Sequence, residues 1–183
     1  VINNMDEVPI GYQTGNTPNF NYGFNFAFKW KGFDLAFDLT GGSGIGFMPN
    51  WEQKRTFHEG GNNPEYYLSD CWTLSDIWDA NSTLVKGKYP MPLIGNASHS
   101  NYWTSDFWFQ NVRYIKMRNL EVGYSLPQQW LKYAKIKSLR LYVAGSNLFT
   151  ITNKHGFDPE GTTESGLQYP TTRVINVGFN LKF

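Results

Sequence analysis

The sequence predicts an all-β protein folded as an antiparallel up-and-down meander of about five strands. Apolar and polar residues alternate over several segments of about ten residues, which is the pattern of strands with one apolar face. The 183 residues include 17% aromatic residues, 18 glycines and 9 prolines, a composition typical of β-rich chains with many turns. Short and long connections alternate between the predicted strands, which favours a meander over a Greek key.

The first two predicted strands, residues 20–30 and 33–42, pair as a hairpin. The segment "FNYGFNFAFKW" alternates without a break and places one set of aromatic side chains on the same face: Phe20, Tyr22, Phe24, Phe26, Phe28 and Trp30. The "KG" that follows is a tight-turn signal. The returning segment "FDLAFDLTG" alternates in the same way and has Asp34 and Asp38 on its polar face.

Residues 43–111 are predicted to form a long loop, because all periodicity is lost there. They contain five of the seven tryptophans, among many Asn, Ser, Asp, Gly and Pro residues. So long a stretch without regular structure is unusual in a compact domain, whereas a membrane barrel has short turns on one side and long loops on the other. A short helix is expected inside this loop, near "NPEYYLSDCW".

The remaining strands and connections follow in order: strand 112–126, turn 127–137, strand 138–151, loop 152–170 and strand 172–183. In the first of these strands the apolar residues change from odd to even positions near Arg118-Asn119. A change of phase by one residue indicates a β-bulge. The last strand, "RVINVGFNLKF", again has an apolar residue at every second position, and therefore one apolar face.

The net charge, the cysteine count and the distribution of apolar residues exclude several classes of protein. The formal net charge is +1, so no overall field attracts nucleic acid. Cys71 is the single cysteine, which excludes an internal disulfide and a cysteine-built metal cluster. No run of 18 apolar residues occurs, so no transmembrane helix is predicted. The opening "VINNMDEVPI" lacks the pattern of a signal peptide. Either the protein is cytoplasmic, or these residues are an internal or C-terminal piece of a longer protein.

No pattern of residues indicates catalysis, a cofactor or a metal site. Asp34 and Asp38 are four residues apart in a strand, which separates them by about 13 Å, farther than the paired carboxylates of a glycosidase; a solvated wall is the better interpretation. The 3 histidines lack metal-ligand spacing. A Cys–His nucleophile pair would have to be assembled by the fold, without a supporting motif. Asp158 and Glu160, in "GFDPEG", are expected to organise a turn.

The aromatic face of residues 20–30 has two interpretations. It is either a belt that faces lipid or the packed core of a soluble sandwich, and six large rings on one face are bulky for a sandwich core. The soluble alternative is a carbohydrate-binding β-sandwich whose tryptophans stack on sugar rings. From the pattern alone the two interpretations stay open.

Three aromatic residues are candidates for contact with a substrate or partner: Tyr102, Trp103 and Trp108, just before a predicted strand. Exposed aromatic rings stack on sugars or anchor a protein partner. The alternative is that these rings pack together and fold the long loop onto the rim of the barrel, since large aromatic side chains are mostly buried.

Four segments of the chain, in this order, match a known family. They are "PNFNYGFNFAFKWKGFDLAFDLTGGSG", "YIKMRNLEVGYSLP", "GSNLFTIT…GFDPE" and "YPTTRVINVGFNLKF". They resemble SusC/RagA-like TonB-dependent outer-membrane transporters, and the resemblance covers nearly the whole chain. It implies that residues 1–183 are the C-terminal part of a barrel of about 22 strands with a plugged lumen. The fold would be a partial transmembrane β-barrel with long extracellular loops. The plug domain and the TonB-contacting motif are expected to lie elsewhere.

The resemblance also implies a place and partners for the protein. It would be an importer of oligosaccharides or peptides in the outer membrane of a Gram-negative bacterium, without enzymatic activity. The expected partners are a SusD-like surface lipoprotein that acts as a lid, the TonB complex, the barrel assembly machinery and the lipid bilayer, with no nucleic acid. Residues 31–32 and 127–137 would be periplasmic turns. Phe183 would be the C-terminal aromatic residue that the assembly machinery recognises.

Overall fold

A computed structural model describes residues 4, 11, 15–94, 98–155 and 158–183. The opening segment considered for a signal peptide lies, apart from Asn4, outside these described residues. The chain divides into two compact units. The sheet unit consists of residues 18–44, 113–153 and 170–183, and the loop unit of residues 1–17, 45–112 and 154–169. No helix in the described part of the chain is long and apolar enough to cross a membrane.

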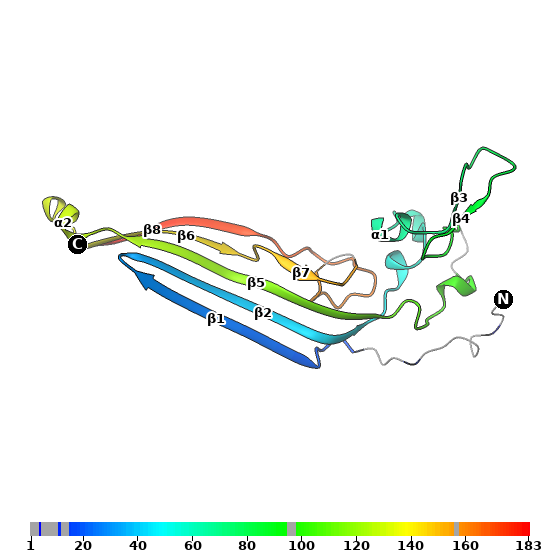
Figure 1. Ribbon diagram of the computed structural model, residues 1–183, viewed down its shortest axis with the longest axis horizontal. Helices are drawn as coiled ribbons and strands as arrows, with labels where there is room; N and C mark the ends of the chain where they lie inside the picture. The colour runs from blue at the N-terminus through cyan, green and yellow to red at the C-terminus, as the bar shows by residue number, and fades with distance from the viewer. Residues whose placement is uncertain (1–3, 5–10, 12–14, 95–97, 156–157) are drawn as a thin grey trace. The chain divides into compact units, whose positions relative to one another are not determined.

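The sheet unit is built on one mainly antiparallel sheet of 6 strands, in the order β1-β2-β5-β6-β8 with β7 paired to β5 (Figure 1). Its elements are β1 (Phe20–Trp30), β2 (Phe33–Phe47), β5 (Gln110–Ser125), α2 (Gln128–Leu131), η5 (Lys132–Ala134), β6 (Ser138–Ser146), β7 (Thr150–Thr152) and β8 (Val174–Lys182). Long strands that follow one another in the chain are neighbours, which confirms the predicted up-and-down meander. The described strands do not close into a barrel, and β1 and β8 form the two edges.

β1 and β2 form a hairpin with a two-residue turn at Lys31 and Gly32. Both turn residues have a positive φ, of 47° and 90°, as in the type I′ turn that suits the right-handed twist of two paired strands. The register places Phe26 opposite Phe37, and their rings stack with centroids 5.1 Å apart. Cross-strand aromatic pairs of this kind stabilise an antiparallel ladder.

β2 is longer than the sequence predicts and continues to Phe47. The predicted strand ends at residue 42 because "GGSGIGF" lacks alternating large side chains. In the structure these glycines belong to the strand and leave room for a neighbouring ring. A Cβ on Gly41 would lie 2.3 Å from the ring of Tyr22 and 2.5 Å from the carbonyl oxygen of Tyr114. The hydroxyl of Tyr22 donates a hydrogen bond of 2.7 Å to that same oxygen.

β5 changes phase between Arg118 and Asn119. Both side chains reach the polar face of β2, because Arg118 Nε donates to Thr40 Oγ1 at 2.9 Å and Asn119 Nδ2 donates to Asp38 Oδ2 at 3.1 Å. Adjacent residues of a regular strand point to opposite faces. The ladder is therefore bulged at this point, which confirms the phase change predicted from the sequence.

The fourth predicted strand is divided in the structure into β6 and β7. Asn147, at the break, has a φ of 54°, a left-handed conformation that Asn tolerates better than most residues. The register with β5 changes from Asn119 opposite Ser146 to Lys116 opposite Thr150. Three residues of this strand therefore lie opposite two of β5, and a continuous ladder cannot form.

The sheet has one apolar and one polar face. Exposed apolar side chains lie on one face of five strands: Phe24, Phe26 and Phe28 of β1, Phe33 of β2, Val122 of β5, Leu141 and Val143 of β6, and Val177 and Phe179 of β8. The residues of β6 and β8 are in register, since Leu141 is opposite Phe179 and Val143 is opposite Val177. The other face contains amides and ion-paired charges.

The loop unit has short elements around an aromatic cluster. They are η2 (Trp51–Gln53), η3 (His58–Gly60), α1 (Glu65–Leu68), the paired strands β3 (Thr73–Leu74) and β4 (Leu84–Val85), and η4 (Ser100–Tyr102) (Figure 1). α1 lies inside the segment predicted to contain a short helix and begins after Pro64. The long predicted loop therefore has local structure and a small core of its own.

Candidate functional site

Arg140 of β6 joins two carboxylates on the polar face of the sheet. Its Nε donates to Asp34 Oδ1 at 3.0 Å, and its Nη2 donates to both Asp34 and Glu121. Gly123 makes room for the guanidinium, since a Cβ there would lie 2.4 Å from Nη2. Charge-assisted bonds with this geometry tie three strands together. Asp34 is thus paired with Arg140, and Asp38 accepts a hydrogen bond from Asn119. Each carboxylate therefore binds a neighbouring strand, and the two do not act together as a catalytic pair.

Two of the three candidate contact residues are buried in the aromatic cluster of the loop unit. Tyr102 is 4% exposed and Trp108 is 3% exposed. The ring of Trp108 stacks on Tyr67 at 5.9 Å with an interplanar angle of 10°, and Tyr67 stacks on Tyr89 at 5.3 Å. Burial raises the pKa of Tyr67 above its usual range. These rings form a core, which is the packing alternative considered from the sequence.

Hydrogen bonds fix the orientation of both buried rings. The hydroxyls of Tyr102 and Thr56 lie 2.7 Å apart, and Thr56 Oγ1 also bonds the backbone of Leu93. Trp108 Nε1 donates to the carbonyl oxygen of Asn101 at 2.9 Å. Each polar atom of the two side chains therefore has a partner inside the loop unit.

Trp103, the third candidate, is half-buried and directly follows η4. Its side chain has more access to solvent than those of Tyr102 and Trp108. Direct contact of any of the three with a substrate or partner stays a prediction.

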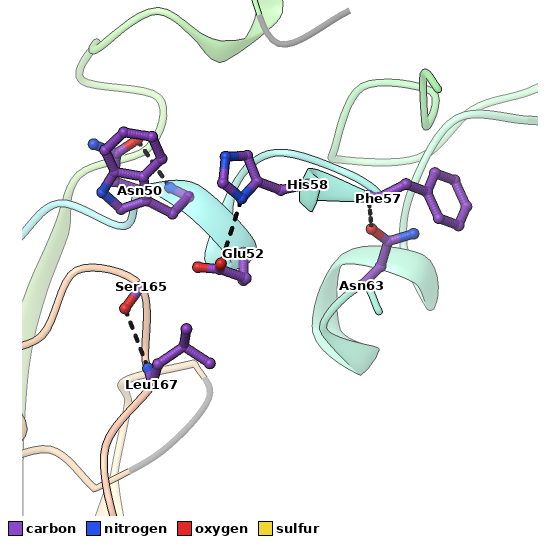
Figure 2. A network of polar contacts seen from close by, with 8 residues as sticks. Asn50, Glu52, Phe57, His58, Asn63, Ser165 and Leu167 are labelled. Carbon is purple, nitrogen blue, oxygen red and sulfur yellow. Dashed lines mark hydrogen bonds and ion pairs between the residues drawn. The ribbon is translucent and has the colours of Figure 1, made fainter. Parts of the chain in front are cut away.

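The loop unit also contains a cavity of about 680 Å³ between η2, η3, the start of α1 and the segment near residue 165. Figure 2 shows the ring of His58 directed at Glu52, with Nδ1 and Oε1 3.3 Å apart. Phe57 has a φ of 53°, and Asn63 Oδ1 accepts the N–H of this strained residue at 2.7 Å (Figure 2). This bond holds the turn that forms one wall of the cavity.

The lining of the cavity is polar and acidic at several points. Glu52, Glu59 and Glu65 contribute carboxylates, and His58 contributes an imidazole. Among the described residues, Glu52 Oε2 and Asn63 Nδ2 are buried without a hydrogen-bond partner. Most of the exposed lining is nevertheless apolar, so the cavity combines an apolar surface with a few acidic groups, as ligand sites commonly do. The sequence analysis missed the site, because Glu52 and His58 are six residues apart in no recognisable motif.

The second loop is held together by a half-buried lysine. Lys154 Nζ donates to the carbonyl oxygens of Gly161 at 2.7 Å and Asp158 at 3.3 Å, and it lies 4.0 Å from the ring centroid of Phe47. Burial lowers the pKa of this lysine. Asp158 Oδ1 also accepts the N–H of Glu160 at 3.1 Å, and the carbonyl oxygen of Asp158 accepts the N–H of Gly161 at 2.9 Å, which confirms that Asp158 and Glu160 take part in a turn.

A second lysine is buried more completely. Lys54 is 2% exposed. Burial lowers its pKa to about 8, with a further decrease from the charge of Arg55 and an opposing effect of Glu164. Among the described residues, no group of three or more His, Cys, Asp or Glu side chains is placed to hold a metal ion.

Phe183 follows β8 and is 76% exposed. Its recognition by an assembly machinery stays a prediction.

Comparison with curated proteins finds similarity to TonB-dependent receptors, although no protein-family model matches the chain. TonB-dependent receptor P3 of Formosa agariphila is 29% identical over 180 residues, which cover 91% of this chain and 16% of the receptor. TonB-dependent receptor SusC of Bacteroides thetaiotaomicron is 30% identical over 95 residues, 49% of this chain and 9% of the receptor. The chain therefore spans only a small part of the length of these relatives.

Solved structures show the same relationship. The RagAB peptide importer in its closed-closed state matches with a TM-score of 0.67 and 25% identity, over 94% of this chain and 18% of the compared one. The open-open state of that importer shares the fold, with a TM-score of 0.66. Sequence and structure therefore agree that the chain is similar to a segment of SusC/RagA-like TonB-dependent receptors.

Proposed function

We propose that the chain forms part of the wall and outer loops of an importer in the outer membrane of a Gram-negative bacterium. The observation that carries this proposal is the contrast between the two faces of the sheet. One face exposes phenylalanine, valine and leucine side chains from five strands, and the other holds ion pairs and amides. Strands of a membrane barrel alternate in this way between lipid and a wet interior.

The exposed apolar face is unfavourable in water. Phe24 and Phe179 are 60% and 65% exposed, and a contiguous apolar patch of this kind causes aggregation unless something covers it. Hydrocarbon covers such a face without any specific partner. In the alternative, a soluble carbohydrate-binding β-sandwich, a second sheet would have to cover it.

The two edges of the sheet support the same proposal. β1 and β8 each have one neighbouring strand among the described residues. An open edge leaves backbone N–H and C=O groups without partners, which a bilayer does not tolerate. Further strands of the receptor would pair with both edges and close the barrel.

The imported substrate is proposed to be an oligosaccharide or a peptide. RagAB is a peptide importer, and SusC is a curated relative of this chain. The proposed partners are a SusD-like lipoprotein lid, the TonB complex and the barrel assembly machinery, the last through Phe183. The chain has no enzymatic role in this scheme. Trp103 and the acidic cavity are the parts of the loop unit proposed to meet the lid or substrate, while Tyr102 and Trp108 hold the loop in shape.

Fractionation of cells that express the full-length receptor tests the proposal. We expect the receptor in the outer-membrane fraction, in a form that migrates differently on gels before and after heating because the barrel is folded. Recovery in the buffer-soluble fraction without detergent, together with sugar binding, would instead support the soluble sandwich and overturn the importer.

A further inference from the structure

One end of the sheet unit gathers three segments that are distant in the sequence. They are the turn between β1 and β2, the segment 127–137 that contains α2 and η5, and the end of β8; Figure 1 shows α2 and the C-terminus at this end of the sheet. The N–H of Ser125 donates to the carbonyl oxygen of Gly32 at 2.7 Å, and the N–H of Lys137 donates to that of Lys182 at 2.9 Å. These bonds connect the segments into one surface, which we name the basic rim.

The basic rim carries a dense set of positive charges. Four exposed lysines of its turns belong to it: Lys31, Lys132, Lys135 and Lys137. Lys29 and Lys182 are also exposed, but they lie on the polar face, opposite Asp34 and Ser138 in the register. The segment 127–137 contains no acidic residue. Asp34, which lines the same hollow as Lys29 and Lys31, is already ion-paired with Arg140. Asp34 also lies opposite Lys29 in the register, whereas Lys132, Lys135 and Lys137 have no acidic residue in their own segment.

Aromatic rings are interleaved with these lysines. Trp130 and Tyr133 are 63% and 97% exposed, whereas Leu131 between them is 5% exposed and anchors α2. Lys31 Nζ lies 5.0 Å from the ring centroid of Trp30. Tryptophan and tyrosine with an apolar body and a polar edge prefer the headgroup region of a bilayer.

The position of the rim along the strands agrees with that preference. The apolar face continues along β6 and β8 to Leu139 opposite Leu181. Beyond this pair the chain presents Lys137, which is exposed. Hydrocarbon contact thus ends where the lysines begin, at the depth where a headgroup phosphate lies.

We propose that the basic rim binds the phosphate groups of anionic phospholipids in the bilayer leaflet next to it. The inference rests on the proposed function, because it requires that the sheet is a membrane wall. A phosphate in this leaflet meets several ammonium groups, and the rings hold the turn at the correct depth. A zwitterionic lipid is attracted less strongly to the rim, since the positive group of its own headgroup is repelled by the lysines.

The test uses the purified full-length receptor and native mass spectrometry. The receptor is mixed with equal amounts of phosphatidylglycerol and phosphatidylcholine that have the same acyl chains, and the ratio of bound lipids is measured. We expect the wild type to prefer phosphatidylglycerol. The variant K132Q/K135Q should lose this preference by roughly fivefold for each lysine removed, and added salt should weaken the wild-type preference.

The matched control is K86Q/K88Q, which removes two exposed lysines of the loop unit and should leave the lipid ratio unchanged. Equal binding of both lipids by a heat-modifiable, membrane-recovered wild type overturns the rim proposal while the proposed function stands. An equal decrease in both double variants also overturns it, because net charge alone would then explain the preference. A receptor that is never recovered with membranes overturns the proposed function, and the rim proposal with it.

Discussion

Replacement of Phe26 by arginine in the full-length receptor places a charge in the middle of the apolar face. Phe26 follows Phe20, the first residue of β1, by six positions, or about 20 Å along the strand. With a strand tilt of about 40°, this is about 15 Å across the bilayer, close to the middle of an apolar band of about 25 Å. The side chain is 48% exposed, so in the proposed membrane wall the guanidinium would meet lipid rather than protein.

The expected cost of Phe26→Arg is about 2–4 kcal/mol for a cation at this depth. Loss of the stacked pair with Phe37, at 5.1 Å, adds about 1 kcal/mol. The first term alone corresponds to roughly a 30- to 700-fold decrease in the folding equilibrium constant. Urea titration of the receptor in lipid vesicles, with the heat-modifiable band as the readout, measures this decrease.

Asn25→Arg is the matched control on the other face of the same strand. Asn25 is opposite Asp38 in the register, so the new guanidinium would face a carboxylate in a wet interior. We expect a change within about 0.5 kcal/mol. If Asn25→Arg and Phe26→Arg lower the stability equally, the assignment of the two faces is wrong.

Three further predictions concern single positions. Gly41→Val would place a side chain on the ring of Tyr22 and should destabilise the receptor by about 1–3 kcal/mol. The control Gly15→Ala, with open space around it, should leave the melting temperature unchanged. Equal melting temperatures of the two variants would contradict the role given to the glycines of β2. The pKa of Lys54 is lowered from 10.5 to about 8 in the folded protein. As pH rises, Lys54 therefore loses its proton in the folded state before it does so in the unfolded state, and the folded state becomes relatively more stable. The contribution of Lys54 to the free energy of unfolding should increase by about 2 kcal/mol between pH 7 and 9.5. Denaturant titrations should show this rise in the wild type relative to Lys54→Met, and parallel curves for the two proteins would refute the reasoning. Trp108→Ala should destabilise the loop unit by about 3–5 kcal/mol and make it sensitive to limited proteolysis. Trp103→Ala should leave the proteolysis pattern unchanged and, as a proposed substrate contact, should weaken only the binding of the substrate.

Much of the sheet could be predicted because strand patterns are local. The alternation in residues 20–30 and in the last strand appears directly in the sequence, and the structure has β1 at Phe20–Trp30 and β8 at Val174–Lys182. The phase change at Arg118-Asn119 was equally visible, since a bulge shifts the apolar residues by one position. The end of β2 was missed, because a strand of glycines has no side chains to alternate.

The candidate site could be predicted less well, because its contacts join residues that no local pattern connects. Tyr67, Tyr89 and Trp108 stack on one another, and burial of such a set depends on the path of the whole loop. The same holds for Glu52 and His58, whose pairing depends on two short 3₁₀ turns. Composition could identify tryptophans as important but could not separate a packed ring from an exposed one.

The sequence by itself determined which side chains share a face of each strand, because a strand repeats every two residues whatever its neighbours are. With its aromatic alternation and its motifs, it also determined the class of fold. Only the tertiary structure decided that Asp34 pairs with Arg140, 106 residues away, that Gly41 of β2 lies against the ring of Tyr22, and that Tyr102 and Trp108 are buried. These outcomes depend on strand order and register, which arise when distant segments compete for the same partners.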